Sequence, residues 1–132
     1  MPKTIAQKVV FKNAAPKVLY NFYMDSKQHA AVTGAPAKIT TKVGAQYKVW
    51  GDYISGKNLH LVKDKLIVQS WRGSDWRAED PDSLFMISLE ANGKDTVLTM
   101  IHSNVPDEQY DGLVEGWKDF YWKPWKKALK KK

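Results

Sequence analysis

The chain has 132 residues, of which 43% are hydrophobic, so it suits one domain with a substantial core and excludes wholesale disorder. It has no cysteine, which excludes disulfides and thiolate chemistry. The formal net charge is +7, and the lysines at positions 126, 127, 130, 131 and 132 supply five of these charges, which leaves +2 for the rest of the chain.

The sequence shows no segment that predicts membrane insertion. The first ten residues lack the apolar core of a signal peptide, and no apolar run approaches the length of a membrane span. We therefore expect a soluble cytoplasmic protein without a membrane span.

The first third of the chain predicts one strand and two short helices. Alternation of apolar and polar residues over 4–12 is typical of a strand. Pro16 suits the first turn of a helix, which the apolar spacing continues to about residue 23. A second short helix to about residue 32 can be capped by Asp25 or Ser26.

Successive strands and turns are predicted from residue 37 to residue 104. The apolar phase of the segment 53–62 changes between Ile54 and the pair Leu59 and Leu61, and a β-bulge around Gly56 would produce that slip. Asn92-Gly93 is a strong hairpin signal. Short connections favour an antiparallel meander, with strands over residues 37–41, 46–50, 53–62, 66–72, 83–90 and 96–102.

A long aromatic helix is predicted at the C-terminal end, from about Asp107 to Ala128. Its apolar face repeats at helical spacing, with Tyr110, Leu113, Val114, Trp117 and Tyr121. Pro124 lies inside the pattern and must kink the helix or end its regular hydrogen bonding. Such a helix must lie across the sheet, and the pair can close over a pocket.

An ordered set of short motifs carries a resemblance to a known family. These motifs are Thr33-Gly-Ala-Pro-Ala37, Gly51-Asp-Tyr-Ile-Ser-Gly56, Leu59-His-Leu61, Ile67-Val-Gln-Ser-Trp-Arg72, Gly116-Trp117 and Tyr121-Trp122. Together they resemble the homologues of the activator of the heat-shock protein 90 ATPase, a branch of the START-like and birch-pollen-allergen-like helix-grip superfamily.

The resemblance implies an α+β helix-grip fold in a single START-like domain over residues 1–132. Its curved antiparallel sheet of about six to seven strands would wrap around a long C-terminal helix, with two short helices after the first strand. The family implies an internal cavity and no shared catalytic motif. The eukaryotic activator also has a separate N-terminal domain that supplies major chaperone contacts, and we expect no such domain in this chain of 132 residues.

We expect one cavity between the sheet and the helix, with two polar candidates in it. His102 shares a strand face with Met100; it could orient a ligand or act as an acid or base, or it could be a satisfied core histidine. Gln69 is a similar case. The predicted ligand-binding residues are Tyr47, Leu59, Leu61, Ile67, Gln69, Trp71, Phe85, Met100, His102, Trp117 and Tyr121.

Other chemistry finds little support in the sequence. The three histidines lack metal-ligand neighbours, so neither a metal nor a cofactor is expected. No serine stands in a nucleophile-elbow context, and no catalytic residue is assigned. Arg72 should point outward and pair with the acidic loop of residues 75–82.

Three functions from different classes follow. The first is a non-catalytic domain that binds a hydrophobic small molecule in the cavity. The alternative is a module that interacts with a chaperone of the heat-shock protein 90 type, which the lysine tail could steer towards an acidic surface. The third is a lyase- or cyclase-type enzyme that uses the same cavity. Nucleic-acid binding is not expected, because no recognition motif accompanies the tail.

Overall fold

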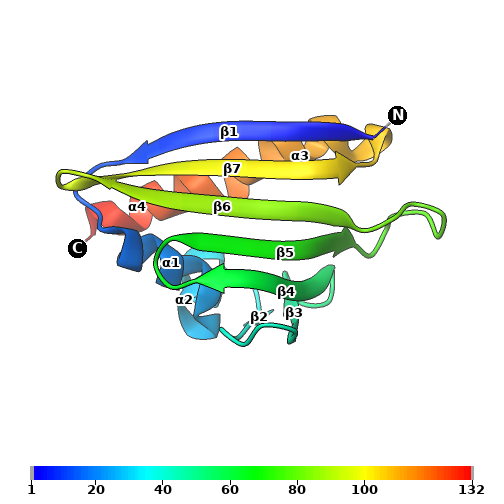
Figure 1. The fold of residues 1–132 in the computed structure, drawn as a ribbon, viewed down its shortest axis with the longest axis horizontal. Helices are drawn as coiled ribbons and strands as arrows, with labels where there is room; N and C mark the ends of the chain where they lie inside the picture. The colour runs from blue at the N-terminus through cyan, green and yellow to red at the C-terminus, as the bar shows by residue number, and fades with distance from the viewer. Residues whose placement is uncertain (1, 132) are drawn as a thin grey trace.

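The computed structural model describes residues 2–131 and has one seven-stranded antiparallel sheet, as predicted. The strands follow the order β1-β7-β6-β5-β4-β3-β2, so each strand after β1 pairs with its neighbour in sequence, and β7 returns to pair with β1 (Figure 1). Their bounds are β1 (Lys3–Phe11), β2 (Ala37–Lys38), β3 (Gln46–Val49), β4 (Ile54–Val62), β5 (Leu66–Gly73), β6 (Ser83–Asn92) and β7 (Asp95–Val105).

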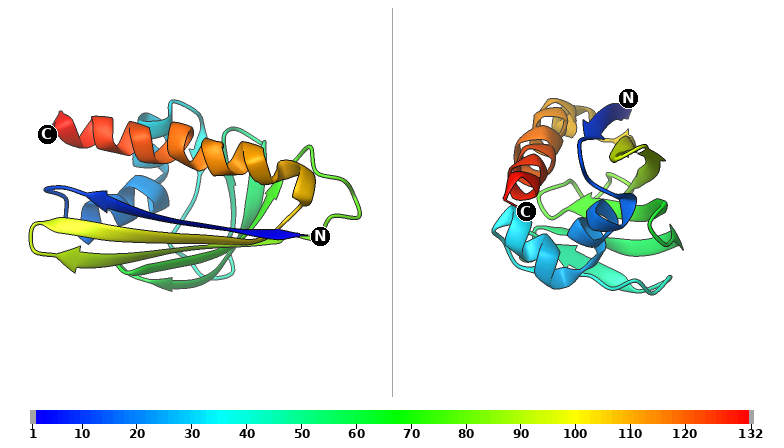
Figure 2. Two further views of the ribbon diagram at one scale, coloured as in Figure 1. Left: turned by 90° about the horizontal axis from the view of Figure 1, so that it is seen from above. Right: turned by 90° about the vertical axis from the view of Figure 1, so that its left-hand side faces the viewer.

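The helices lie on one side of this sheet. Two short helices, α1 (Pro16–Met24) and α2 (Ser26–Thr33), follow β1. The chain ends in a long helix that runs along the concave side of the curved sheet, with α1 and α2 near its C-terminal half (Figure 2). It comprises a 3-10 turn η1 (Asp107–Gln109), α3 (Tyr110–Trp117), a π-helical segment η2 (Lys118–Trp122) and α4 (Lys123–Lys130). The α+β helix-grip architecture is therefore confirmed.

Proline 124 interrupts the regular hydrogen bonding of the long helix, as its position predicted. Proline lacks an N–H, and its ring clashes with the carbonyl group four residues earlier, here that of Phe120. The turn that contains this carbonyl is wound as the π-helical segment η2. The helix continues through it and buries Tyr121, Trp122 and Trp125 against the sheet and α1.

The β-bulge in β4 lies three residues later than predicted. The pairing of β4 with β5 keeps one register from Ile54 to Asn58 and shifts before His60, so Leu59 is the extra residue. Asn58 faces the core, whereas Leu59 is 46% exposed, and the prediction that Leu59 faces the interior is wrong. Gly56 instead permits the close approach of the two strands, because a Cβ there would lie 1.9 Å from the carbonyl oxygen of Ser70.

Several local signals hold and others shift by a few residues. The Asn92-Gly93 turn joins β6 to β7 as predicted, with Gly93 at a φ of 62°. Asp25 precedes α2 without a side-chain capping hydrogen bond. The strand expected over residues 37–41 spans only Ala37–Lys38. Within residues 2–131, no helix is long and apolar enough to cross a membrane.

Candidate functional site: a cleft beside the C-terminal helix

A cleft of about 470 Å³ lies between the first half of the long helix and the turn from β3 to β4. Two aromatic side chains mark its opening to solvent, since Phe120 is 55% exposed and Tyr53 is 40% exposed. The cleft is lined by Trp50, Tyr53, Ile54, Trp71, Gln109, Gly112, Leu113, Gly116, Trp117, Phe120 and Tyr121.

The helix contributes one wall through residues spaced three and four positions apart. Gly112 and Gly116 lie one turn apart on this wall. A Cβ built on Gly112 would meet no heavy atom within 4 Å, and one built on Gly116 would meet only the Phe120 ring at 3.8 Å. The fold therefore has room for a side chain at both positions, and the glycines leave that room to the cleft.

Trp50 forms the opposite wall from a strained backbone position. It has a φ of 57°, which is uncommon for a residue other than glycine. Its indole N–H donates to the hydroxyl oxygen of Tyr121 over 3.0 Å, and its ring meets the Phe120 ring edge-on at 5.4 Å. These two contacts hold the indole of Trp50 against the helix.

Tyr121 connects Trp50 to a buried chain of hydrogen bonds. Its hydroxyl lies 2.9 Å from His29 Nε2, and His29 Nδ1 lies 2.8 Å from the carbonyl oxygen of Tyr23. A carbonyl can only accept, so His29 Nδ1 carries the proton and Nε2 accepts from Tyr121. Burial lowers the pKa of His29 to about 4 and raises the pKa of Tyr121, so both groups are neutral near pH 7.

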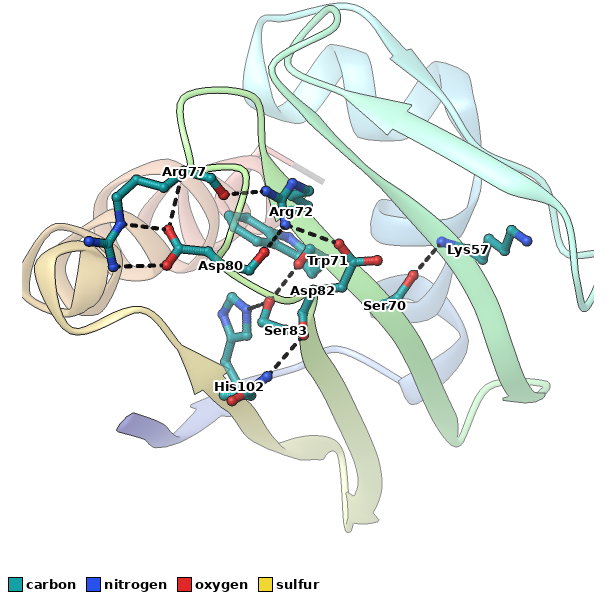
Figure 3. Close-up of polar contacts among 10 residues, drawn as sticks. Lys57, Ser70, Trp71, Arg72, Arg77, Asp80, Asp82, Ser83 and His102 are labelled. Carbon is teal, nitrogen blue, oxygen red and sulfur yellow. Dashed lines mark hydrogen bonds and ion pairs between the residues drawn. The ribbon is translucent and has the colours of Figure 1, made fainter. Parts of the chain in front are cut away.

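The inner end of the cleft is formed by Trp71 and Trp117. The Trp71 ring packs 6.0 Å from Trp117 and 5.7 Å from Trp76 in the loop after β5. Arg72, the next residue, points to the other side and donates to the carbonyl oxygens of Arg77 and Asp80 (Figure 3). Its ion pair with Asp82 at 3.4 Å confirms the predicted pairing with the acidic loop.

His102 is a satisfied core histidine. The Trp117 indole N–H donates to His102 Nδ1 over 3.1 Å, so Nε2 carries the proton of the neutral ring. That proton goes to Ser83 Oγ at 2.7 Å, and the Ser83 hydroxyl donates to the carbonyl oxygen of Trp71 at 2.6 Å (Figure 3). Burial lowers the pKa of His102 to about 3, which removes it as an acid or base near neutral pH.

Gln69 is also engaged inside the core. Its amide nitrogen donates to Asn58 Oδ1 at 2.9 Å, and Asn58 Nδ2 donates to the carbonyl oxygens of Thr40 and Lys42. Its own Oε1 is buried without a hydrogen-bond partner among residues 2–131. Gln69 and Asn58 together fix the segment before β3, and neither residue lines the cleft.

The structure brings three of the eleven predicted residues together at the cleft, namely Trp71, Trp117 and Tyr121. Leu59 lies on the exposed bulge, and Leu61 is partly buried against the core. The other six are fully buried in the core: Tyr47, Ile67, Gln69, Phe85, Met100 and His102.

Eight lining residues were absent from the predicted set. Leu113 was on the predicted helical stripe, and Gly116 was in a quoted motif, so a signal for these two existed. Tyr53, just before β4, and Ile54, its first residue, also stand in a motif given above, whereas Trp50 lies in the turn after β3, although the predicted strand extended to residue 50. The remaining three are Gln109, Gly112 and Phe120.

The cleft offers no charge and no metal ligands. Of the residues that the structure describes, those that line the cleft are all uncharged. Within the same part of the chain, no group of three or more histidine, aspartate or glutamate side chains could hold a metal ion. The arrangement therefore suits binding through apolar and ring contacts.

A family model for Activator of Hsp90 ATPase homolog 1-like proteins matches residues 13–130. The chain belongs to this family. Among its curated relatives, the activator of 90 kDa heat shock protein ATPase homolog from Dictyostelium discoideum is 26% identical over 117 residues, which cover 88% of this chain and 30% of the relative. The human homolog 1 is 26% identical over 107 residues, covering 81% and 31%. The chain thus spans about a third of the length of these relatives.

Solved structures share the fold of this family member. A crystal structure of an HSP90 activator from Plasmodium falciparum superposes with a TM-score of 0.89 at 20% identity and covers 96% of both chains. A putative protein in the dynemicin biosynthetic locus superposes with a TM-score of 0.79 at 17% identity, covering 97% of this chain and 47% of the other. These likenesses establish the fold.

Proposed function

We propose that this member of the activator family is a non-catalytic protein that binds an apolar small molecule in the cleft beside the long helix. The observation that carries the proposal is the bare helix wall at Gly112 and Gly116, where the fold has room for a side chain. Each glycine costs the helix about 0.8–1.0 kcal/mol relative to alanine. An occupant that lies against this wall would explain why the space is left open.

The size and the walls of the cleft support the same function. Its volume of about 470 Å³ lies within the range of about 300–1,000 Å³ that is usual for small-molecule sites. An apolar molecule would gain about 25 cal/mol for each Å² that it removes from water. A lyase- or cyclase-type activity would need an acid or base at the cleft, and the two buried histidines, His29 and His102, are both committed to internal hydrogen bonds.

Native mass spectrometry of freshly purified protein tests this function. We expect a co-purifying apolar molecule on the unaltered chain and its loss from Gly116→Leu, whose side chain would fill the cleft. Glu115→Leu is the matched control, because it adds the same side chain at the neighbouring, exposed position. A molecule that stays on Gly116→Leu would contradict the proposal.

A second candidate is a module that interacts with a chaperone of the heat-shock protein 90 type. Family membership and the likeness to an HSP90 activator support it. The exposed lysines of α4, which include Lys126, Lys127 and Lys130, would suit an acidic surface on the partner. Titration of purified chaperone with this chain in low and high salt tests the candidate, because exposed charges are screened within about 8 Å at physiological ionic strength.

A further inference from the structure

A second groove lies between the end of β1 and α4, and it shares no lining residue with the cleft. Its volume is about 420 Å³, and it is lined by Val10, Lys12, Asn13, Lys126, Leu129 and Lys130. We infer that this groove binds an extended segment of a partner protein in which acidic and apolar residues alternate. The inference goes beyond both functions proposed above, because it names a separate surface and the chemistry of the segment that this surface takes.

The groove crosses the free edge of the sheet. β1 lies at one edge and pairs only with β7 (Figure 1). Phe11 is buried on the concave side, so Val10 and Lys12 point to the convex side. The other bank is formed by α4, which belongs to the long helix on the concave side (Figure 2). A groove lined from both sides therefore passes over the edge of β1.

The backbone of this edge can pair with a further strand. From Ile5 to Phe11 the pairing of β1 with β7 keeps one register, without a bulge. Within residues 2–131, the backbone hydrogen bonds of β1 are those of this ladder, so every second residue directs its N–H and C=O towards the free edge. Gln7 ties the middle of β1 to the long helix through the carbonyl oxygen of Val114 at 3.0 Å. The end of the strand, residues 8–12, is the part left for main-chain pairing with a partner.

The charges at the groove select an acidic segment. Its lining includes three lysines and no acidic residue. In the part of the chain that the structure describes, the ammonium groups of Lys12, Lys126 and Lys130 form neither a hydrogen bond nor an ion pair, and Lys126 Nζ lies 5.9 Å from the centre of the Phe11 ring. Lysines beside an edge strand oppose its pairing with a second copy of this chain, because like charges repel. An acidic strand would instead neutralise them.

The apolar residues of the groove define the alternation. Val10 is 45% exposed on the convex side, and Leu129 packs partly buried against the core. The side chains of an added strand alternate between the two faces of the sheet. Acidic side chains on the concave side would meet Lys126 and Lys130, while apolar side chains on the convex side would cover Val10. A segment of alternating acidic and apolar residues therefore fits both banks.

Calorimetric titration of the full chain with a capped peptide of alternating glutamate and valine tests the inference. We expect saturable binding, which weakens at least about tenfold when glutamine replaces each glutamate. Two further peptides carry methyl groups on the backbone nitrogens of either the valines or the glutamates. Alternate residues of a strand direct their N–H groups to opposite edges, so one methylated peptide should bind at least about tenfold more weakly than the other. Amide hydrogen exchange over residues 8–12 should slow when the unmodified peptide binds.

Two double variants with the same net charge locate the site. Lys126→Gln with Lys130→Gln should weaken binding of the unmodified peptide at least about fivefold. Lys38→Gln with Lys42→Gln is the matched control, because it removes the same charge from exposed positions outside the groove, and it should bind the peptide like the unaltered chain. Circular dichroism checks that both variants are folded.

Each contrary outcome overturns a stated part of the inference. Equal affinity for the two methylated peptides would overturn pairing with β1. An equal loss of binding in the two double variants would overturn the groove as the site, because net charge alone would then account for the binding. A peptide that does not bind the unaltered chain would overturn the whole inference and leave the cleft untouched, since the cleft is tested with a neutral molecule.

Discussion

Trp117 joins the long helix to β7 through His102, because its indole N–H donates to His102 Nδ1 at 3.1 Å. The same indole stacks on the ring of Phe85 in β6, with centroids 4.5 Å apart and an interplanar angle of 7°. One side chain therefore provides a hydrogen bond to β7, a ring stack on β6 and part of the inner wall of the cleft.

Removal of this side chain should destabilise the fold strongly. Trp117→Ala is expected to lower the free energy of unfolding by about 3–5 kcal/mol, because it leaves a cavity in the core. Trp117→Phe keeps a ring but leaves His102 Nδ1 without its donor, at a cost of about 1–3 kcal/mol. Denaturant melts measure both. A loss below about 1 kcal/mol for the alanine variant would show that the helix is docked in another way.

The two buried histidines predict a loss of stability in mild acid. Burial lowers the folded-state pKa of His29 to about 4 and that of His102 to about 3, below the ordinary value of 6.5. The unfolded chain therefore takes up protons first as the pH falls below about 6.5. Stability is complete above that pH and declines through the interval down to pH 4 and 3. Between pH 7 and pH 5 each histidine should cost about 2 kcal/mol.

Denaturant melts at pH 7 and pH 5 check this expectation. His102→Gln should reduce the difference between the two pH values by about half, whatever its effect on stability at pH 7. His60→Gln, which alters an exposed histidine on β4, is the control and should keep the whole difference. A difference that His102→Gln leaves unchanged would mean that His102 does not contribute to it.

The glycines of the cleft wall predict an unusual stabilising substitution. Gly116→Ala should raise the free energy of unfolding by about 0.5–1 kcal/mol, because alanine is the better helix former and its Cβ meets only ordinary contact. Gly93→Ala, at a φ of 62° in the β6–β7 turn, should instead destabilise. Thermal melts distinguish the two. Destabilisation by Gly116→Ala would mean that other atoms of the protein already occupy the space beside Gly116.

The lysines of α4 should matter for an acidic partner and not for the cleft. Replacement of Lys126, Lys127 and Lys130 by glutamine should slow association with a heat-shock protein 90 type chaperone and reduce its dependence on salt. Binding of an apolar probe should not change, since none of the three lines the cleft. Stopped-flow association at two salt concentrations measures the first effect. Unchanged rates would remove these lysines from chaperone binding.

Periodicity in the sequence was sufficient for the sheet, its order of elements and the long helix. Alternation fails where the chain leaves a regular strand. Both misplacements occur in such places: the bulge in β4 and the end of the strand expected over residues 37–41. The bulge at Leu59 depends on how β4 pairs with β5, because the register of the two strands shifts between Asn58 and His60. A change in the apolar phase of one strand shows that a β-bulge exists, but it does not show at which residue the bulge lies.

The cleft was harder to predict, because its walls meet only in the folded chain. Trp50 follows β3 in a turn and contacts Tyr121, 71 residues away in sequence. Nothing local to Trp50 indicates that contact. The polar side chain of His102 suggested a contact with a ligand. In the folded chain, Trp117 and Ser83 already satisfy both of its ring nitrogens.

Titration of N-phenyl-1-naphthylamine, a neutral fluorophore that brightens in apolar surroundings, tests most directly whether the cleft binds an apolar molecule. The account predicts saturable brightening on the unaltered chain and on Glu115→Leu, and at least a tenfold weaker response on Gly116→Leu with its fold intact by circular dichroism. Equal binding to all three proteins, or no saturable binding to any, would contradict it.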